Sequence, residues 1–347
     1  MTTTNSSEAG RSLTRAAFAS FLAASRNGHD GGAAALAERL FPADTVARRI
    51  LSRGAVAPMG SADLTGALAA NATGAFLASL APLSAGAQLI NRGLRVSLSD
   101  GAQIALPVRA SGAVPLSWVP EGAPIPVRSY GLNKVTVGPI RKAAAITVHS
   151  RELAKQPGAE AVFTMLLRED AAVSLDAALF ATTGATDAAP AGLLNGVTPQ
   201  SATAGGGVAA MEADLVKLAT AVTAAGGNSV LFIAAPAQAE AVAIRKPEIA
   251  SRMTASAALA AGTVIAIDAA ALVSGFGDAP DVESSHDATL HMDNAPAQVS
   301  TAGAPNVVAA PSQSMFQAGL IATRIILDVA FALRRPGLVA YLTGATW

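Results

Sequence analysis

Residues 103–149 constrain the fold most. Strand-like patterns occur at both ends of this segment, and its central part is rich in proline and glycine. Ile104, Leu106 and Val108 alternate with Ala105, Pro107 and Arg109, which is the period-2 pattern of a strand with an edge-type proline. The central stretch 115–126 has too many Pro and Gly residues for a regular element. The sequence therefore predicts a long extended excursion. It has little core of its own and needs a neighbouring surface to stabilise it.

Helical periodicity occurs on both sides of this excursion. Residues 12–52 have a helical pattern that breaks near 27–32, and 64–80 are predicted to form a further helix. Pro157-Gly158 opens a long helix that runs to about residue 181 and stops before Gly184, as a C-terminal glycine favours. Its core face is predicted from residues at steps of 4, 7, 4 and 3, namely Val162, Leu166, Val173, Ala177 and Phe180.

The C-terminal half of the chain alternates helices with strands and then ends on strands. Between residues 209 and 284, two predicted helices alternate with predicted strands at 229–233 and 263–267, which indicates a compact α/β subdomain. The apolar stretch 320–342 is strand-like, because alternate residues fall on one face: Ile321, Thr323, Ile325, Leu327, Val329, Phe331 and Leu333. Charged residues lie between them, so a half-buried strand is favoured over a membrane-spanning helix.

The charge balance excludes one broad class of protein. The chain has 24 basic and 24 acidic residues, whereas a free nucleic-acid-binding protein usually carries a basic surplus. Charged residues make up only 14% and hydrophobic residues 51%. Two explanations stay open, namely burial between subunits and alanine enrichment from a GC-rich genome. The sequence has no Cys, which excludes disulfides, thiolate metal sites and cysteine nucleophiles.

The sequence has no P-loop, no G-x-S-x-G elbow and no H-E-x-x-H motif. We therefore predict no catalytic residue, no cofactor and no metal, and the chain is not expected to be an enzyme. The best metal candidate is 283–293, where His286 and His291 are five residues apart and align on neither a strand face nor a helix face. We expect a solvated loop and edge strand there, and a structural role for His149. Three further acidic residues are expected to be ion-pairing surface groups, namely Glu152, Glu169 and Asp170.

Four motifs occur in an order that resembles a known family. Trp118–Gly122 lies in the excursion, Ser150–Leu153 precedes the long helix, Pro190–Gly196 follows it, and Arg335–Gly337 separates the last two strands. The set resembles the HK97-type major capsid proteins of tailed bacteriophages and prophages. In that family, segments like W-V-x-E-G, S-x-E-L and P-x-G-[IL]-L follow one another in this order.

The resemblance covers about residues 100–347 and implies an α+β fold, the HK97-like capsid fold. Its parts are an N-terminal arm, an extended β loop, a peripheral domain with a long spine helix at 158–182, and an α/β axial domain. The implied segments are 1–53 (an N-terminal helical scaffold-like segment), 54–100 (the arm and its lead-in), 101–148 (the extended loop), 149–208 (the peripheral domain), 209–284 (the axial domain) and 285–347 (peripheral-domain strands that return to the axial domain).

The resemblance also implies a function. A major capsid (head) protein assembles with itself, as hexamers and pentamers, into an icosahedral shell around phage double-stranded DNA. Assembly takes place in the bacterial host cytoplasm, and the product is the virion capsid. Scaffold, portal and decoration proteins and non-specific contact with DNA are further implied partners, and no membrane is involved. Two alternatives stay open: a gene-transfer-agent or encapsulin-like shell, and a soluble α/β enzyme centred on 205–285, which would need a pocket with convergent polar groups.

Two residues of the excursion are expected to hold it against an adjacent subunit. Trp118 is of a residue type that commonly anchors interfaces, and Glu121 supplies a carboxylate for a basic partner on the neighbour. The basic candidates are Arg128, Arg141 and Lys142.

Overall fold

The computed structural model describes residues 3–25, 32–51, 73, 76–77, 79–98, 103–109, 117–122, 124–126, 131–153, 156, 158–277, 281–293, 300–301, 307–308 and 310–347. The chain forms two compact units: unit 1 (1–79, 142–171 and 277–328) and unit 2 (80–141, 172–276 and 329–347). Both units contain helices and strands, so the expected α+β class is confirmed. Helix α6 (Ala159–Leu179) and strand β15 (Leu320–Leu333) each contribute residues to both units.

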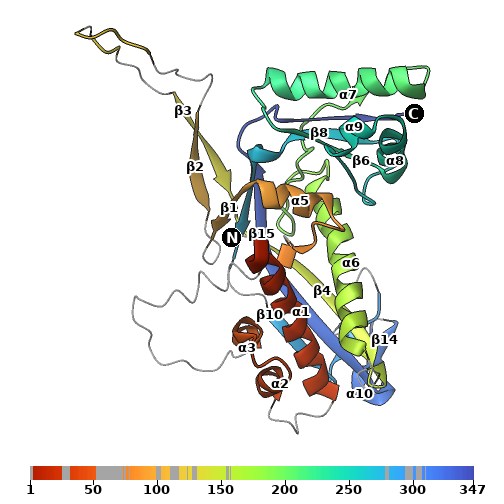
Figure 1. The fold of residues 1–347 in the computed structure, drawn as a ribbon. Helices are drawn as coiled ribbons and strands as arrows, with labels where there is room; N and C mark the ends of the chain where they lie inside the picture. Colours follow the sequence, from red (N-terminus) through yellow and green to blue (C-terminus); the bar gives the residue numbers. More distant parts are fainter. Residues whose placement is uncertain are drawn as a thin grey trace. The chain divides into compact units, whose positions relative to one another are not determined.

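Unit 1 begins with three helices that pack on one another (Figure 1): α1 (Thr3–Ser25), α2 (Gly32–Leu40) and α3 (Thr45–Leu51). The helical pattern predicted for 12–52 is confirmed, although α1 already begins at Thr3. Helix α1 also packs along strand β10 (Asp281–Ser285), and its apolar face is buried, including Leu13, Ala17 and Phe21. The N-terminal helices are therefore part of the core of unit 1. The helix predicted at 64–80 lies largely outside the described residues.

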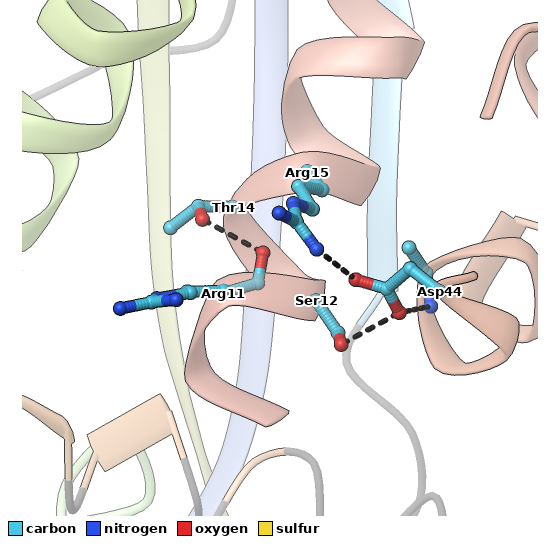
Figure 2. Close-up of polar contacts among 6 residues, drawn as sticks. Arg11, Ser12, Thr14, Arg15 and Asp44 are labelled. Atoms are coloured by element: carbon cyan, nitrogen blue, oxygen red, sulfur yellow. Dashed lines mark hydrogen bonds and ion pairs between the residues drawn. The ribbon is translucent and has the colours of Figure 1, made fainter. Parts of the chain in front are cut away.

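One buried carboxylate joins α1 to α3 (Figure 2). Asp44 precedes α3 and accepts hydrogen bonds from the Ser12 hydroxyl at 2.7 Å and from the backbone N–H of Ala47 at 3.0 Å. Its second oxygen accepts from the Arg15 guanidinium at 3.1 Å. A side-chain oxygen just before a helix satisfies a free N–H of the first turn, and its negative charge is favourable at that end of the helix. Asp44 therefore both caps α3 and fixes α1 against it.

The strands of unit 1 confirm the alternation predicted for the C-terminal part of the chain. Strand β10 pairs antiparallel with residues 322–326 of β15, and β4 (Arg141–Ser150) also pairs with β15. On β15 the side chains of Ile321 and Ile325 are buried, whereas Arg324 is exposed. Within the described residues, no helix is long and apolar enough to cross a membrane. The shorter elements of unit 1 are β11 (Thr289–His291), β12 (Ser300–Thr301), β13 (Val307–Val308), β14 (Ser312–Ser314) and α10 (Met315–Ala318).

The larger sheet of unit 2 has five strands in the order β5-β16-β8-β6-β7. These strands are β5 (Gln200–Ser201), β6 (Val230–Ala234), β7 (Met253–Ala255), β8 (Val264–Asp268) and β16 (Val339–Thr343). Helix α7 (Gly207–Ala224) covers this sheet (Figure 1), and α8 (Pro236–Arg245) and α9 (Pro247–Ala250) lie between β6 and β7 in the chain. All residues of β6 and β8 are buried, as their continuous apolar runs predict. The helices and strands predicted between 209 and 284 are therefore present.

A second group of strands in unit 2 supports a β-hairpin. Strand β1 (Leu94–Ser97) follows helix α5 (Ala85–Arg92) and runs parallel to β9 (Leu272–Phe276), which follows the short helix η2 (Ala269–Ala271). Strand β9 pairs antiparallel with residues 329–333 of β15. The hairpin consists of β2 (Ile104–Arg109) and β3 (Leu132–Val137), paired from Ile104↔Val137 to Arg109↔Leu132. A small core holds its base, formed by Leu98, Val137, Val273 and Ala330.

Helix α6 has nearly the predicted length, but the prediction of its core face was wrong. Val162, Leu166, Val173 and Ala177 of the predicted face are exposed. Of that set only Phe180 is buried, and it lies just beyond the last helical residue. The buried side chains belong to another stripe: Phe163, Leu167, Ala172, Leu175 and Leu179. The helix carries apolar residues on two faces, so periodicity alone could not tell which of them packs inward.

Candidate functional site

The segment between β2 and β3 presents large apolar side chains to solvent. Trp118 is 101% exposed, the highest value among the large hydrophobic residues of the described chain, and Ile125 is 79% exposed. Glu121 is also exposed, and it shares a turn with Gly122, whose positive φ of 75° suits glycine. Burying a Trp removes 150–250 Å² of surface, which is worth about 4–6 kcal/mol. In a single chain Trp118 is not buried, so it does not contribute this free energy to stability.

The structure places the three basic candidates differently. Arg128 lies outside the described residues, and Lys142 is exposed in β4. The Arg141 guanidinium lies 4.0 Å from a carboxylate oxygen of Asp187, a fully exposed residue, which is the limit of an ion pair. Within the described part of the chain no ion pair joins Glu121 to Arg141 or Lys142. The five contact candidates therefore stay predictions.

The Pro190–Gly196 motif has a packing explanation. A Cβ added to Gly192 would lie 2.0 Å from the backbone oxygen of Ala181, so only glycine fits there. The backbone N–H groups of Leu193 and Leu194 donate to the carbonyls of Leu179 and Ala181, at 2.8 and 3.2 Å. Both leucine side chains are buried. The motif therefore docks the chain segment after α6 against the end of that helix.

A second exposed apolar surface lies on α6. Val162, Met165 and Leu166 are 42%, 52% and 40% exposed, and they share one side of the helix because residues three and four apart are neighbours. We call these three residues the α6 stripe. Sequence reasoning missed this surface because it assigned two of its members to the core. The sequence signal for such a surface is a helix that has more apolar residues than one buried face can hold.

The acidic and histidine candidates do not form a metal site in the described structure. Glu283 pairs with Arg324 at 2.5 Å, His286 lies 3.4 Å from Asp287, and His291 Nε2 lies 3.0 Å from a backbone oxygen. Among the described residues, no group of three potential metal ligands converges. Glu152, Glu169 and Asp170 are exposed, as surface groups should be.

His149 lies in an aromatic cluster of unit 1. Its ring centroid is 5.7 Å from that of Phe21 on α1 and 5.4 Å from that of Phe163 on α6. The two phenylalanine rings stack at 5.8 Å. Nearby, the Arg151 guanidinium donates to the carbonyl of Ser25, the last residue of α1, at 2.8 Å. Burial lowers the pKa of His149, because the charged imidazolium loses hydration there.

This lowered pKa predicts that acid weakens unit 1. His149 in the unfolded chain takes up its proton near pH 6.5, whereas the folded protein resists protonation to a lower pH. The His149 contribution is therefore fully present above about pH 6.5 and is lost as the pH falls below it. We expect His149→Phe to have a flatter dependence of the melting temperature on pH than the wild type between pH 8 and 5. His286→Gln is the matched control, and a wild-type slope in His149→Phe would contradict the prediction.

The exposed hairpin segment and the α6 stripe define an α+β protein with large apolar surfaces left open in the single chain. No protein-family model matches the sequence. Among curated proteins, the chain is similar to the "Capsid polyprotein" of Pseudomonas phage PAJU2, at 28% identity over 265 residues. That match covers 66% of this chain and 37% of the relative, so the chain spans little more than a third of the relative's length.

Two solved structures share the fold. A chain of Mycobacterium phage Cain aligns with a TM-score of 0.50 at 16% identity and covers 75% of this chain and 90% of that one. A chain of Mycobacterium phage Adephagia aligns with a TM-score of 0.50 at 15% identity, covering 74% and 89%. Together with the capsid polyprotein, they confirm the resemblance to the HK97-type major capsid proteins and the HK97-like α+β fold that the motifs implied.

Proposed function

We propose that this chain is the major capsid protein of a tailed bacteriophage or prophage, a structural subunit without a catalytic role. Many copies assemble through hexamers and pentamers into an icosahedral shell that encloses double-stranded DNA. In this proposal the shell is the virion capsid and is built in the cytoplasm of the bacterial host. Scaffold, portal and decoration proteins are its further partners.

The observation that carries the proposal is the full exposure of Trp118 on an extended hairpin, in a chain with this fold and a phage capsid relative. A hairpin of two strands is marginally stable by itself in water. Contact with a neighbouring subunit would stabilise this hairpin by burying its apolar side chains. The α6 stripe adds apolar surface of the kind that obligate assemblies bury.

The low charge fits the same proposal. The net charge is zero and only 14% of the residues are charged. Charge repeated over many copies in a closed shell would add up to strong self-repulsion, so a neutral subunit suits a large assembly. The chain also lacks the basic surplus that supplies affinity for phosphates, so contact with packaged DNA is expected to be weak as well as non-specific.

The purified protein is expected to form rings or closed shells. Size-exclusion chromatography with light scattering should give particles far above the 34.4 kDa of one chain, and negative-stain microscopy should display them. Oligomers follow because the hairpin and the α6 stripe expose apolar surface that a second copy can bury. A stable, monodisperse monomer at high concentration would contradict the proposal.

The contents of the particles separate the viral shell from its alternatives. Particles produced in a bacterial host that carries the rest of the phage genome should protect double-stranded phage DNA from nuclease. Host DNA fragments would instead indicate a gene-transfer-agent shell, and a single enclosed enzyme would indicate an encapsulin-like compartment.

A further inference from the structure

Unit 2 contains a pocket of about 320 Å³ beside the base of the β2–β3 hairpin. Its apolar lining includes Pro139, Pro190, Leu193 and Phe331, and its polar lining includes Arg141 and Asn195. The Pro190–Gly196 motif, held in place by Gly192, supplies one wall. This volume is at the lower end of the range of pockets that bind small molecules, so it suits one large side chain and excludes a helix.

Arg141 makes the pocket selective for an anionic neighbour. Its side chain is 25% exposed, and its ion pair with Asp187 has a separation of 4.0 Å. An ion pair at that distance to a fully exposed carboxylate contributes little. The guanidinium therefore remains available for a closer carboxylate, and a planar guanidinium also stacks well on an aromatic ring.

The exposed hairpin segment supplies a matching ligand. Trp118 provides an indole ring with no cover in the single chain, and Glu121 provides a carboxylate three residues later. The turn at Glu121-Gly122 keeps the two residues close in the chain. An aromatic side chain that fills a pocket is a common type of interface hot spot, and Arg is another residue type enriched there.

The partner is a second copy, because Trp118 is fully exposed and the strand that leads to its segment runs away from the pocket. The pairs from Ile104↔Val137 to Arg109↔Leu132 span six residues of each strand, or about 17 Å at 3.3–3.4 Å per residue. The pocket lies at the Val137 end of this ladder, and the Trp118 segment is connected to the opposite end. Trp118 is also fully exposed, so it does not occupy the pocket of its own chain.

We propose that Trp118 of one copy inserts into this pocket of an adjacent copy, with its Glu121 carboxylate paired to the neighbour's Arg141. This inference rests on the proposed function, since it requires the chain to assemble. It deepens that proposal by naming both halves of one contact between subunits. It also assigns the Trp118–Gly122 and Pro190–Gly196 motifs to the two sides of that contact.

A charge swap tests the pair. Glu121→Arg and Arg141→Glu are each expected to lower particle yield about tenfold or more, because each leaves like charges facing one another. The double variant restores the attraction and should recover most of the wild-type yield. Arg245→Glu makes the same charge change at an exposed residue of α8 outside the pocket lining and is the matched control, with near wild-type yield expected. Circular dichroism confirms that each variant is folded.

A chemical cross-link tests proximity without removing the pair. The chain has no Cys, so introduced thiols have no background. Proteins with Pro120→Cys and Asn195→Cys, mixed during assembly and treated with a short bis-maleimide, should give a covalent dimer on a denaturing gel. Neither protein should do so alone. Wild-type particles with no cross-link in the mixture and no rescue by the charge swap would overturn this inference and leave the shell proposal standing. A monomeric wild type would overturn both.

Discussion

Asp176→Ala is expected to lower the free energy of unfolding of unit 2 by about 4 kcal/mol, because it leaves four donors without an acceptor. The Asp176 carboxylate is 2% exposed and accepts from the hydroxyls of Ser84 and Ser256 at 2.5 and 2.6 Å. It also accepts from the backbone N–H groups of Ala85 and Gly86 at 3.1 and 2.8 Å. These two groups open helix α5, where negative charge is favourable.

Asp176→Asn is a sharper version of the same test. The amide keeps the shape, but in either orientation its NH₂ group faces one of the two backbone N–H donors. We therefore expect a loss of about 2–3 kcal/mol, which is a large part of the 5–15 kcal/mol typical of a whole domain. Urea unfolding followed by circular dichroism measures the loss. Asp170→Asn, on the exposed side of the same helix, is the control and should change stability by less than about 0.5 kcal/mol.

Trp347→Ala is expected to destabilise unit 2 by about 4 kcal/mol, through lost packing and a lost hydrogen bond. Trp347 is 6% exposed in the core between α7, α8 and the larger sheet. Its indole Nε1–H donates to the fully buried Asp214 at 2.8 Å, and Asp214 also accepts from the backbone N–H and the hydroxyl of Thr203 at 2.8 and 2.6 Å. Trp347→Phe keeps much of the packing and should lose about 1–2 kcal/mol.

The second tryptophan of the chain is the matched control. Trp118→Ala removes a fully exposed side chain and should change the free energy of unfolding by no more than about 0.5 kcal/mol. The two variants should also differ in assembly, since Trp118→Ala is expected to fold normally and fail to form particles. Equal losses of unfolding free energy in the two variants would contradict both assignments.

Because Trp347 is buried and Trp118 is exposed, wild-type tryptophan fluorescence should mainly follow the unfolding of unit 2.

Much of the fold could be predicted because short-range patterns decide it. The alternation from Ile321 to Leu333, the buried runs of β6 and β8 and the glycines that end α7 each act within a few residues. The site could be predicted only in part. Trp118 and Glu121 stand out as residue types, whereas the pocket that includes Arg141 and Phe331 joins segments far apart in the chain.

Sequence alone determined the long helix α6, the long strand β15, the alternating elements between 209 and 268 and the ordered motifs that resemble the capsid family. Only the tertiary structure decided which face of α6 is buried, because Phe163 and Leu167 pack inward and leave Val162 and Leu166 exposed. It alone also gave the partners of Asp176, since Ser84 and Ser256 are 92 and 80 residues away in the chain. The physical reason is that periodicity records local geometry. Which carboxylate can be buried, and which helix face packs inward, depends on distant segments of the chain that supply hydrogen-bond donors or apolar side chains.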